Sequence, residues 1–461
     1  MRPMDGSSLD RLERAMAGRL LRPASPAYDR ARQTFNGMID RRPAAIATCR
    51  STKEVCDAVQ AARAAGLPVA VRGGGHGVAG HAMGDGALVV DLREMRSVTV
   101  DPGQRRAVVD GGALWEDVDR ATTSHGLATT GGTFGDTGVG GLTLTGGIGF
   151  LMGTCGLSCD NLVRAEVVTA DGHVVTAGEG GDPELLWALR GGGGNFGVVT
   201  TLEFALHQLG PLHVGRYTVP IDSADEALNV TAELMRDAPP ELVLFVVGPT
   251  PELPPLEDGT PSGPATFLRI VAVYQGSMGD AEAVLARLPA LASVSGVVEP
   301  RTYAEVQAAV LPFGLRNYWK GHFLRDLDAA AITAVTAGMH STPGGFSFVL
   351  LEAISGQARH EPPGGAAFGQ RAARWNATAL GIWEDPAHDA VQIGWARGVA
   401  ETLRPASLTG AGYGNYASVD ETDERVRASF GADRFARLAA VKRQHDPDNV
   451  FRFNLNIPPA V

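Results

Sequence analysis

The chain has few cysteines, and they are not arranged as a metal site. Its 461 residues contain four, Cys49, Cys56, Cys155 and Cys159, and their spacing matches no zinc-binding pattern. The N-terminus also shows no signal-peptide pattern. We therefore expect reduced thiols, no bound metal and a cytoplasmic location.

Long apolar runs and clusters of basic residues are absent as well. No stretch of about twenty apolar residues occurs, so the sequence predicts no membrane-spanning helix. The formal net charge is −11, and no run of lysine or arginine offsets it. These features argue against nucleic acid and anionic membrane surfaces as partners. The expected partners are small molecules, bound by a monomer or a homodimer.

Glycine, in contrast, is abundant, and its most informative cluster is Arg72-Gly73-Gly74-Gly75-His76. A glycine-rich loop allows backbone N–H groups to surround an anionic ligand. His76 is the one reactive group in the loop, and the loop directly follows the short apolar run Pro68–Val71. The combination indicates a flavin rather than a metal or a nicotinamide.

The sequence before this loop predicts a helix that ends just ahead of it. Ser51 and Glu54 form a capping box, in which a hydroxyl and a carboxylate satisfy the first free N–H groups of a helix running to about Ala65. Gly66 ends that helix, and Pro68 prevents its continuation.

A dinucleotide-binding motif is the nearest alternative for the loop. Gly75, Gly77 and Gly80 match its spacing, but its last glycine must open a helix, and here a strand from Ala87 to Leu92 is expected next. A second match, at Gly192, Gly194 and Gly197, is also followed by a predicted strand. The sequence therefore disfavours a nicotinamide-binding fold.

A second glycine-rich segment runs from Gly131 to Gly149, with leucine and threonine interleaved. Glycines at this density bring the main chain close to a large planar or phosphorylated ligand, where side chains would collide. We expect a glycine-rich strand whose end contacts the ligand. A flexible linker is disfavoured, because linkers do not alternate glycine with aliphatic residues of the buried type.

The chain divides near residue 208. Before it, short strands, glycine turns and brief helices alternate, beginning with an amphipathic helix from Ser8 to Leu21, and Asp171-Gly172 predicts a hairpin turn. After it, the glycine density falls. Strands such as 242–247 and 346–351 and helices such as 280–288 and 326–339 predict an antiparallel sheet covered by helices on one face. The proline-rich stretch 249–264 predicts a surface loop.

The motifs together resemble those of the berberine bridge enzyme-like FAD-linked oxidases. The resemblance is carried by Arg72–His76, Thr137–Gly149, Gly156–Leu162, Gly191–Val199 and Asp446–Pro459, in this order. It implies an α+β fold of the vanillyl-alcohol-oxidase type: a two-part FAD-binding domain at 1–208, a substrate-binding domain at 209–410 and a segment at 411–461 that returns to the FAD domain.

The resemblance also implies that His76 forms a covalent bond to the 8α carbon of FAD. Many relatives have a second link through a cysteine, but here Phe134 occupies that position. We therefore predict attachment through His76 only. For His81 the sequence allows two roles: it contacts the flavin, or it is a structural residue that is hydrogen-bonded to the loop backbone. The other residues expected to bind the cofactor are Arg72, Gly73, Gly74, Gly75, Gly77, Gly80, Thr133, Thr137, Gly138, Gly141, Leu142, Gly146, Gly147, Gly149, Gly156, Asp160, Asn161, Gly197, Val199, Asn454 and Asn456.

The catalytic phenol is expected in Tyr413-Gly414-Asn415-Tyr416, which is similar to the Tyr-x-Asn-Tyr strand of this family. Because the two tyrosines are three residues apart, a strand would point them to opposite faces unless a bulge intervenes at Gly414. We choose Tyr416 as the base; the alternative is a core tyrosine with a satisfied hydroxyl. A free phenol has a pKa of about 10, so its surroundings must favour phenolate, and Lys320 is the expected positive charge.

Two further residues are candidates for substrate contact or proton transfer. His322 shares strand parity with Lys320, and Glu352 shares it with Leu350, so each pair should lie on one face of a strand. The alternative for both is an ordinary exposed strand face.

The expected reaction follows from these parts. A proton passes from the substrate to Tyr416, a hydride passes to the flavin, and O2 reoxidises the flavin to give H2O2. Thr137 stands where relatives have a residue that controls oxygen access. The substrate is expected to be a small secondary metabolite. The alternatives are a sugar or oligosaccharide oxidase, a redox-neutral flavin-dependent cyclase and a non-enzymatic flavin carrier.

Overall fold

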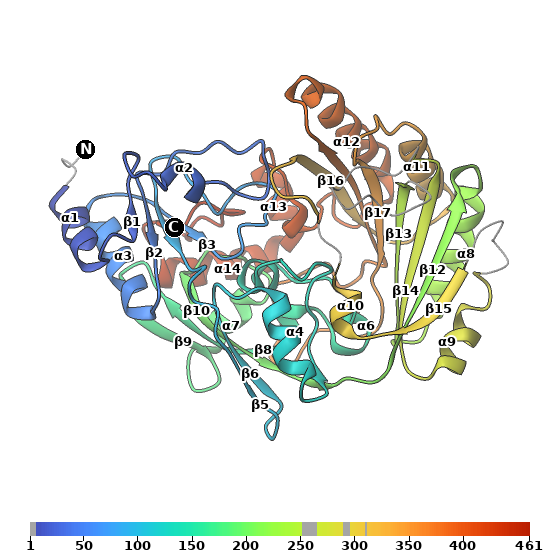
Figure 1. The fold of residues 1–461 in the computed structure, drawn as a ribbon, viewed down its shortest axis with the longest axis horizontal. Coiled ribbons are helices and arrows are strands. Elements are labelled where there is room, and N and C mark those ends of the chain that lie inside the picture. Colours follow the sequence, from blue (N-terminus) through green and yellow to red (C-terminus); the bar gives the residue numbers. More distant parts are fainter. Residues whose placement is uncertain (1–5, 251–264, 289–295, 309–310) are drawn as a thin grey trace.

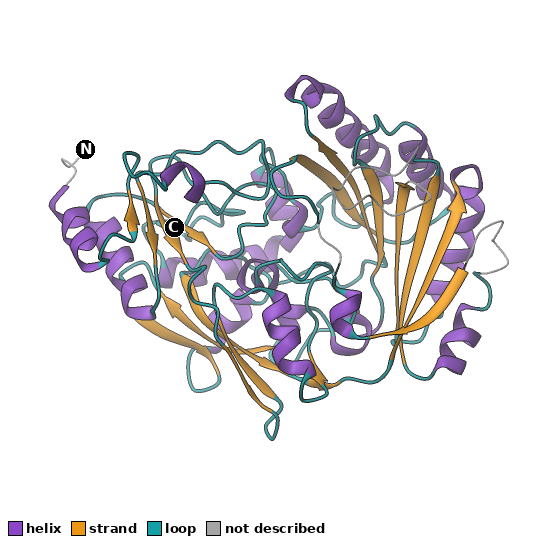
Figure 2. Ribbon diagram, in the orientation of Figure 1, coloured by secondary structure: helices purple, strands orange, loops and turns teal. Residues whose placement is uncertain are grey.

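The computed structural model describes residues 6–250, 265–288, 296–308 and 311–461. The predicted proline-rich loop lies mostly outside these residues. Three sheets make up most of the fold. Figures 1 and 2 show two smaller sheets in one half of the molecule and a large sheet, backed by helices, in the other.

The first sheet carries the strand that leads into the glycine loop. Its order is β1-β2-β4-β3, with β3 and β2 both parallel to β4. Ser51 accepts a hydrogen bond from the Glu54 N–H and caps α3, as predicted, but the capping box is incomplete, because the Glu54 carboxylate accepts the Arg50 N–H instead. The elements here are α1 (Gly6–Ala15), β1 (Leu20–Leu21), α2 (Tyr28–Ala31), β2 (Ala45–Thr48), α3 (Thr52–Ala64), β3 (Val69–Arg72) and β4 (Leu88–Asp91).

The second sheet is antiparallel, in the order β5-β6-β10-β8-β9, and the predicted turn at Asp171-Gly172 joins β8 to β9. Its strands are β5 (Val98–Asp101), β6 (Arg106–Asp110), β8 (Leu162–Val168), β9 (Val174–Gly178) and β10 (Val198–Ala205). A small pair, β7 (Leu127–Ala128) with β11 (His207–Gln208), lies beside it. The helices of this region are α4 (Trp115–Thr123), α5 (Val139–Leu144), α6 (Met152–Cys155), η1 (Ser158–Asn161) and α7 (Pro183–Leu189).

The third sheet has seven strands in the order β15-β12-β14-β13-β17-β18-β16, and all neighbours are antiparallel. One face packs against α8, α9, α11 and α12 in a large apolar core. The strands are β12 (Leu212–Pro220), β13 (Leu242–Thr250), β14 (Phe267–Gln275), β15 (Gly296–Arg301), β16 (Arg316–Leu324), β17 (Phe348–Ala353) and β18 (Trp375–Trp383). The helices are η2 (Ile221–Ser223), α8 (Ala224–Arg236), α9 (Met278–Leu285), α10 (Tyr303–Val306), α11 (Ala329–His340), η4 (Gly356–Arg359), η5 (Pro386–His388), α12 (Asp389–Leu403) and η6 (Arg404–Ala406).

The C-terminal elements are η7 (Gly414–Tyr416), α13 (Asp423–Phe430) and α14 (Ala432–His445). Leu438 and Val441 of α14 share a core with the second sheet, and the Val69 N–H at the start of β3 bonds to the Val450 carbonyl. Figure 1 shows these red segments among the blue and cyan strands. The end of the chain thus packs against its beginning.

Three local predictions were wrong. The N-terminal helix ends at Ala15, because Ala17 and Gly18 adopt positive φ and turn the chain into β1. Val139–Leu144 is a short helix with Gly138 at its N-cap, where a strand was expected. Gly414–Tyr416 is a 3-10 turn, where a strand was also expected.

No helix among the described residues is long and apolar enough to span a bilayer. Within the same residues, no group of three or more His, Cys, Asp or Glu side chains is placed to hold a metal ion.

Candidate active site

A cavity of about 600 Å³ lies between the glycine-rich loops and the open face of the seven-stranded sheet. This volume is within the usual range of small-molecule and cofactor sites, roughly 300–1,000 Å³. One wall consists of backbone from the Arg72–His76 loop, the start of α5 and the Gly191–Gly194 turn. The opposite wall consists of side chains from β13, β14, β17, β18 and β16.

The glycine wall requires glycine where two of its loops meet. A Cβ at Gly74 would lie 2.6 Å from the Gly138 nitrogen, and one at Gly138 would lie 2.4 Å from the Gly74 nitrogen. Gly75 adopts a φ of +73°, which favours glycine. The two glycine motifs predicted from sequence therefore approach each other backbone to backbone.

Several features of this wall fit a large planar, phosphorylated cofactor. A Cβ at Gly77, Gly141 or Gly194 would meet no other atom within 4 Å, although all three residues line the cavity. The backbone there borders space that a ligand can fill. The buried Asn454 Oδ1 atom, in the cavity lining, has no hydrogen-bond partner among the described residues. Such atoms are satisfied when a ligand supplies the missing partner.

Many of the residues predicted to bind the cofactor line this cavity. The predicted residues in the lining are Gly73, Gly74, Gly75, His76, Gly77, His81, Thr133, Thr137, Gly138, Gly141, Leu142, Gly197, Val199 and Asn454. Burial lowers the pKa of His81 to about 4, so its ring is neutral at pH 7.

Asp160, Asn161 and Gly156 do not line the cavity. The Asp160 carboxylate pairs with buried Arg371, and it accepts the Leu157 N–H at 2.8 Å. The Asn161 amide donates to the carbonyls of Cys155 and Leu157. Their polar groups are used within the protein, so the motif around them shapes the turn behind the cavity lining.

Two further predicted residues, Gly149 and Arg72, stabilise the loops around the cavity. A Cβ at Gly149 would collide with the Gly131 carbonyl oxygen at 2.0 Å, so this glycine permits close packing of two loops. Arg72 donates to the Ala31 carbonyl, and burial lowers its pKa to about 10. The predicted residues that do not line the cavity are Arg72, Gly80, Gly146, Gly147, Gly149, Gly156, Asp160, Asn161 and Asn456.

Tyr416 and Glu352 meet on the sheet side of the cavity. The Tyr416 hydroxyl donates a hydrogen bond of 2.8 Å to Glu352 Oε1, and the Asn376 amide donates to Glu352 Oε2 at 2.6 Å. Glu352 is fully buried. Burial raises the pKa of its carboxyl to about 7, against the lowering effect of the two hydrogen bonds. A carboxyl group with a pKa near neutrality is suited to accept a proton in a catalytic step.

The surroundings of Tyr416 do not favour phenolate. Burial raises the pKa of Tyr416, and the Glu352 carboxylate raises it further. The predicted phenolate was therefore wrong: the phenol keeps its proton and donates it to Glu352.

Tyr413 and Tyr416 both line the cavity, with ring centroids 4.8 Å apart. The prediction of opposite faces assumed a strand, and the 3-10 turn removes that alternation. The Tyr413 hydroxyl accepts the N–H groups of Gly147 and Ile148, at 2.8 and 3.0 Å. Burial raises the pKa of Tyr413 as well. Tyr413 therefore holds the glycine-rich turn in place.

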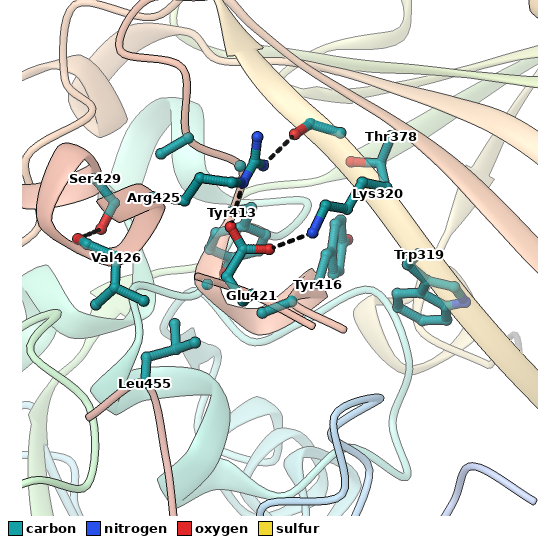
Figure 3. A pocket seen from close by; sticks show the side chains of 15 residues that line it. Trp319, Lys320, Thr378, Tyr413, Tyr416, Glu421, Arg425, Val426, Ser429 and Leu455 are labelled. Carbon is teal, nitrogen blue, oxygen red and sulfur yellow. Dashed lines mark hydrogen bonds and ion pairs between the residues drawn. The ribbon is translucent and has the colours of Figure 1, made fainter. Parts of the chain in front are cut away.

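Lys320 does not supply positive charge to Tyr416. Figure 3 shows Lys320 directed toward Glu421, and its Nζ lies 2.9 Å from Glu421 Oε2 and 3.3 Å from Asp420 Oδ1. His322 is also buried outside the cavity lining, where burial and Arg425 lower its pKa to about 4. The prediction that Lys320 and His322 share one face of their strand was correct, but that face of β16 packs against α12 and not against the cavity.

Sequence reasoning did not identify most of the substrate-side wall. Its side chains are mainly apolar. The alternation of apolar side chains along a strand does not reveal whether they face a protein core or a ligand. They are Phe150, Phe245, Val247, Val271, Leu311, Trp319, Phe348, Leu350 and Leu380, together with Arg269. It also missed Asp136, whose Oδ1 lies 3.6 Å from His76 Nε2.

Fold and site together define a flavin-dependent enzyme, and comparison with known proteins specifies the family. The family model described as "FAD binding domain" matches residues 43–178, and the model described as "Berberine and berberine like" matches residues 412–458. The (R)-6-hydroxynicotine oxidase of Paenarthrobacter nicotinovorans is 32% identical, over 96% of this chain and 97% of that protein.

Solved structures agree. The 6-hydroxy-D-nicotine oxidase from Arthrobacter nicotinovorans has a TM-score of 0.85 and 30% identity, over 96% of this chain and 98% of that one. The BBE-like 1 protein of Physcomitrella patens has a TM-score of 0.86 at 22% identity, over 98% and 99% of the two chains. The chain belongs to the berberine bridge enzyme-like FAD-linked oxidoreductases.

Proposed function

We propose that this enzyme is an oxidase that transfers a hydride from an apolar small molecule to FAD, which is attached covalently through His76 alone, and that O2 is reduced to H2O2. The observation that carries this proposal is the hydrogen-bonded pair of Tyr416 and Glu352, which lies in the same cavity as the glycine wall. The proposal assigns residues 1–208 and 411–461 to FAD binding and residues 209–410 to substrate binding.

In this proposal, Tyr416 and Glu352 form a proton relay. The Tyr416 oxygen accepts the proton that leaves the substrate hydroxyl or activated carbon, while its own proton passes over 2.8 Å to Glu352 Oε1. The Asn376 amide holds the other carboxylate oxygen and so orients Glu352. FAD, when bound, accepts the hydride and passes two electrons to O2.

The sheet side of the cavity supports an apolar substrate. Phe245, Val247 and Val271 stand on neighbouring strands, and Leu350 and Leu380 extend the same surface toward Trp319. A sugar would leave most of its hydroxyl groups without partners against such a wall, where Arg269 is one of few polar side chains, and unpartnered polar groups cost about 1–3 kcal/mol each. This argues against an oligosaccharide oxidase, although a glucooligosaccharide oxidase of Sarocladium strictum is 38% identical over 39% of this chain and 36% of that protein.

A substrate screen coupled to peroxide detection tests this proposal. Apolar alcohols and amines, including polycyclic ones, should release H2O2, and mono- and oligosaccharides of similar size should not. Turnover of a substrate without peroxide release would instead indicate the redox-neutral cyclase. For a non-enzymatic flavin carrier, none of the compounds in the screen would reduce the bound FAD.

Changing His76 to alanine should remove the covalent flavin. The wild-type protein, denatured and analysed by mass spectrometry, should be heavier than its sequence by one FAD, and His76→Ala should show the sequence mass. The control is His81→Ala, which removes the other histidine of the cavity and should keep the adduct. A denatured wild-type protein without an FAD-sized adduct would contradict the proposal.

Changing Thr137 to leucine should slow the reaction with oxygen. Thr137 lines the cavity, and its small side chain leaves room that leucine would fill. We expect stopped-flow measurements to show reoxidation by O2 slowed severalfold, with a smaller effect on flavin reduction by substrate. Thr137→Ser is the matched control and should behave as the wild type. Equal slowing of both half-reactions would refute a role in oxygen access.

A further inference from the structure

Asp136 and His76 form a partly buried pair beside the cavity, in which the Asp136 side chain is 37% exposed while the facing atoms, His76 Nε2 and Asp136 Oδ1, are buried. His76 Nε2 lies 3.6 Å from Asp136 Oδ1, and neither atom has a hydrogen-bond partner in the part of the chain that the structure describes. The His76 side chain is only 14% exposed. An imidazole N–H and a carboxylate oxygen complement each other, and catalytic hydrogen bonds are often long until the ligand is bound.

The neighbourhood of His76 restricts how its ring can turn. The ring is stacked on Phe35, with centroids 4.2 Å apart and an interplanar angle of 13°, and it is nearly parallel to the ring of Phe134 at 6.4 Å. In this orientation, Nε2 is the nitrogen beside Asp136. The aromatic contacts therefore direct one particular nitrogen toward the carboxylate.

The loop that carries Asp136 is anchored on both sides. The Gly135 N–H donates to the Gln307 carbonyl at 3.1 Å, and the Gly135 carbonyl accepts the Glu116 N–H at 2.8 Å. One residue further, the Thr137 carbonyl accepts the Trp115 N–H at 3.0 Å. These bonds tie the loop to the start of α4 and to the end of α10. Asp136 thus stands at a defined position relative to His76.

We propose that Asp136 is a positioning residue for the attachment of FAD. By accepting a hydrogen bond from Nε2–H, the Asp136 carboxylate holds His76 in the tautomer whose Nδ1 carries a free electron pair, as a buried aspartate does for the histidine of a catalytic triad. Nδ1 is then the nitrogen that bonds to the 8α carbon. The inference rests on the proposed covalent link through His76.

The step balances with O2 as oxidant. A bond forms between Nδ1 and the 8α carbon, one proton leaves the 8α methyl group, and the Nε2 proton leaves the imidazole through Asp136. The electron pair of the broken 8α C–H bond would remain on the isoalloxazine ring, and O2 would then take up these two electrons and the two released protons to become H2O2. No group outside the protein, FAD and O2 is needed.

The test separates binding of FAD from its attachment. Apoprotein produced under riboflavin limitation is mixed with FAD; binding is measured on the native protein by quenching of FAD fluorescence, and attachment over time by the mass of the denatured protein. Asp136→Asn and Asp136→Ala should bind FAD with unchanged affinity and attach it about tenfold or more slowly, the usual order of effect when a carboxylate that orients an imidazole is lost. A purely structural role would weaken binding and attachment together.

Glu116→Gln is the matched control. Glu116 contacts the same loop through its backbone, but its carboxylate lies 3.3 Å from Arg96 rather than near His76. This variant should attach FAD at the wild-type rate. Wild-type rates in both Asp136 variants would overturn the inference, and so would loss of FAD binding in both. A wild-type protein without an adduct would overturn the covalent link itself, a result distinct from failure of the Asp136 variants alone.

Discussion

Replacing Tyr416 by phenylalanine is expected to lower kcat/KM by about 10²–10⁴-fold, the range that general acid–base catalysis contributes. The substitution keeps the ring that packs edge-on against Trp319 and Tyr413, and removes only the oxygen that accepts the substrate proton. Steady-state peroxide production measures the loss, and rapid anaerobic flavin reduction should show the same factor, since the missing step precedes reoxidation.

Two other tyrosines serve as comparisons. Tyr413→Phe removes a hydroxyl that holds the Gly147 and Ile148 N–H groups, so it should lower Tm and leave the rate of flavin reduction much closer to the wild type. Tyr274→Phe, on the helix-covered face of the large sheet, should change neither. A kcat/KM for Tyr416→Phe within a few-fold of wild type would exclude the relay.

Glu352→Gln is expected to remove the acidic limb of the pH profile as well as most of the activity. The relay requires Glu352 as a carboxylate, and burial raises its pKa to about 7. In the wild type, kcat/KM should therefore rise about tenfold per pH unit below pH 7 and level off above it. Because glutamine cannot titrate, the variant should be slow and independent of pH across this range.

The pH profile of Glu352→Gln is compared with that of a control variant that loses a carboxylate elsewhere in the protein. Glu299→Gln does so at the edge strand β15, and it should keep both the rate and the acidic limb. If Glu352→Gln retained a limb near pH 7, another group would be responsible for the pH dependence, and Glu352 would have only a structural role.

The glycine wall could be predicted because its causes are local. The N-cap at Ser51 and the hairpin at Asp171-Gly172 likewise depend on a few adjacent residues each, and the sequence alone places them. The same holds for the covered antiparallel sheet, whose strands and helices alternate at their characteristic periods. Sequence therefore determined the family, the FAD cofactor and the glycine-rich wall of the site.

The chemistry of the other wall depends on which face of a strand packs against the helices. Strand parity correctly paired Lys320 with His322 and Leu350 with Glu352, but parity is the same for either face. Only the packing of α12 against β16 placed the first pair away from the cavity, and only the fold brought Glu352 to Tyr416, 64 residues further along the chain. The pKa of Glu352 and the pairing of Asp136 with His76 likewise arise from burial and from contacts between distant segments, which no local pattern encodes.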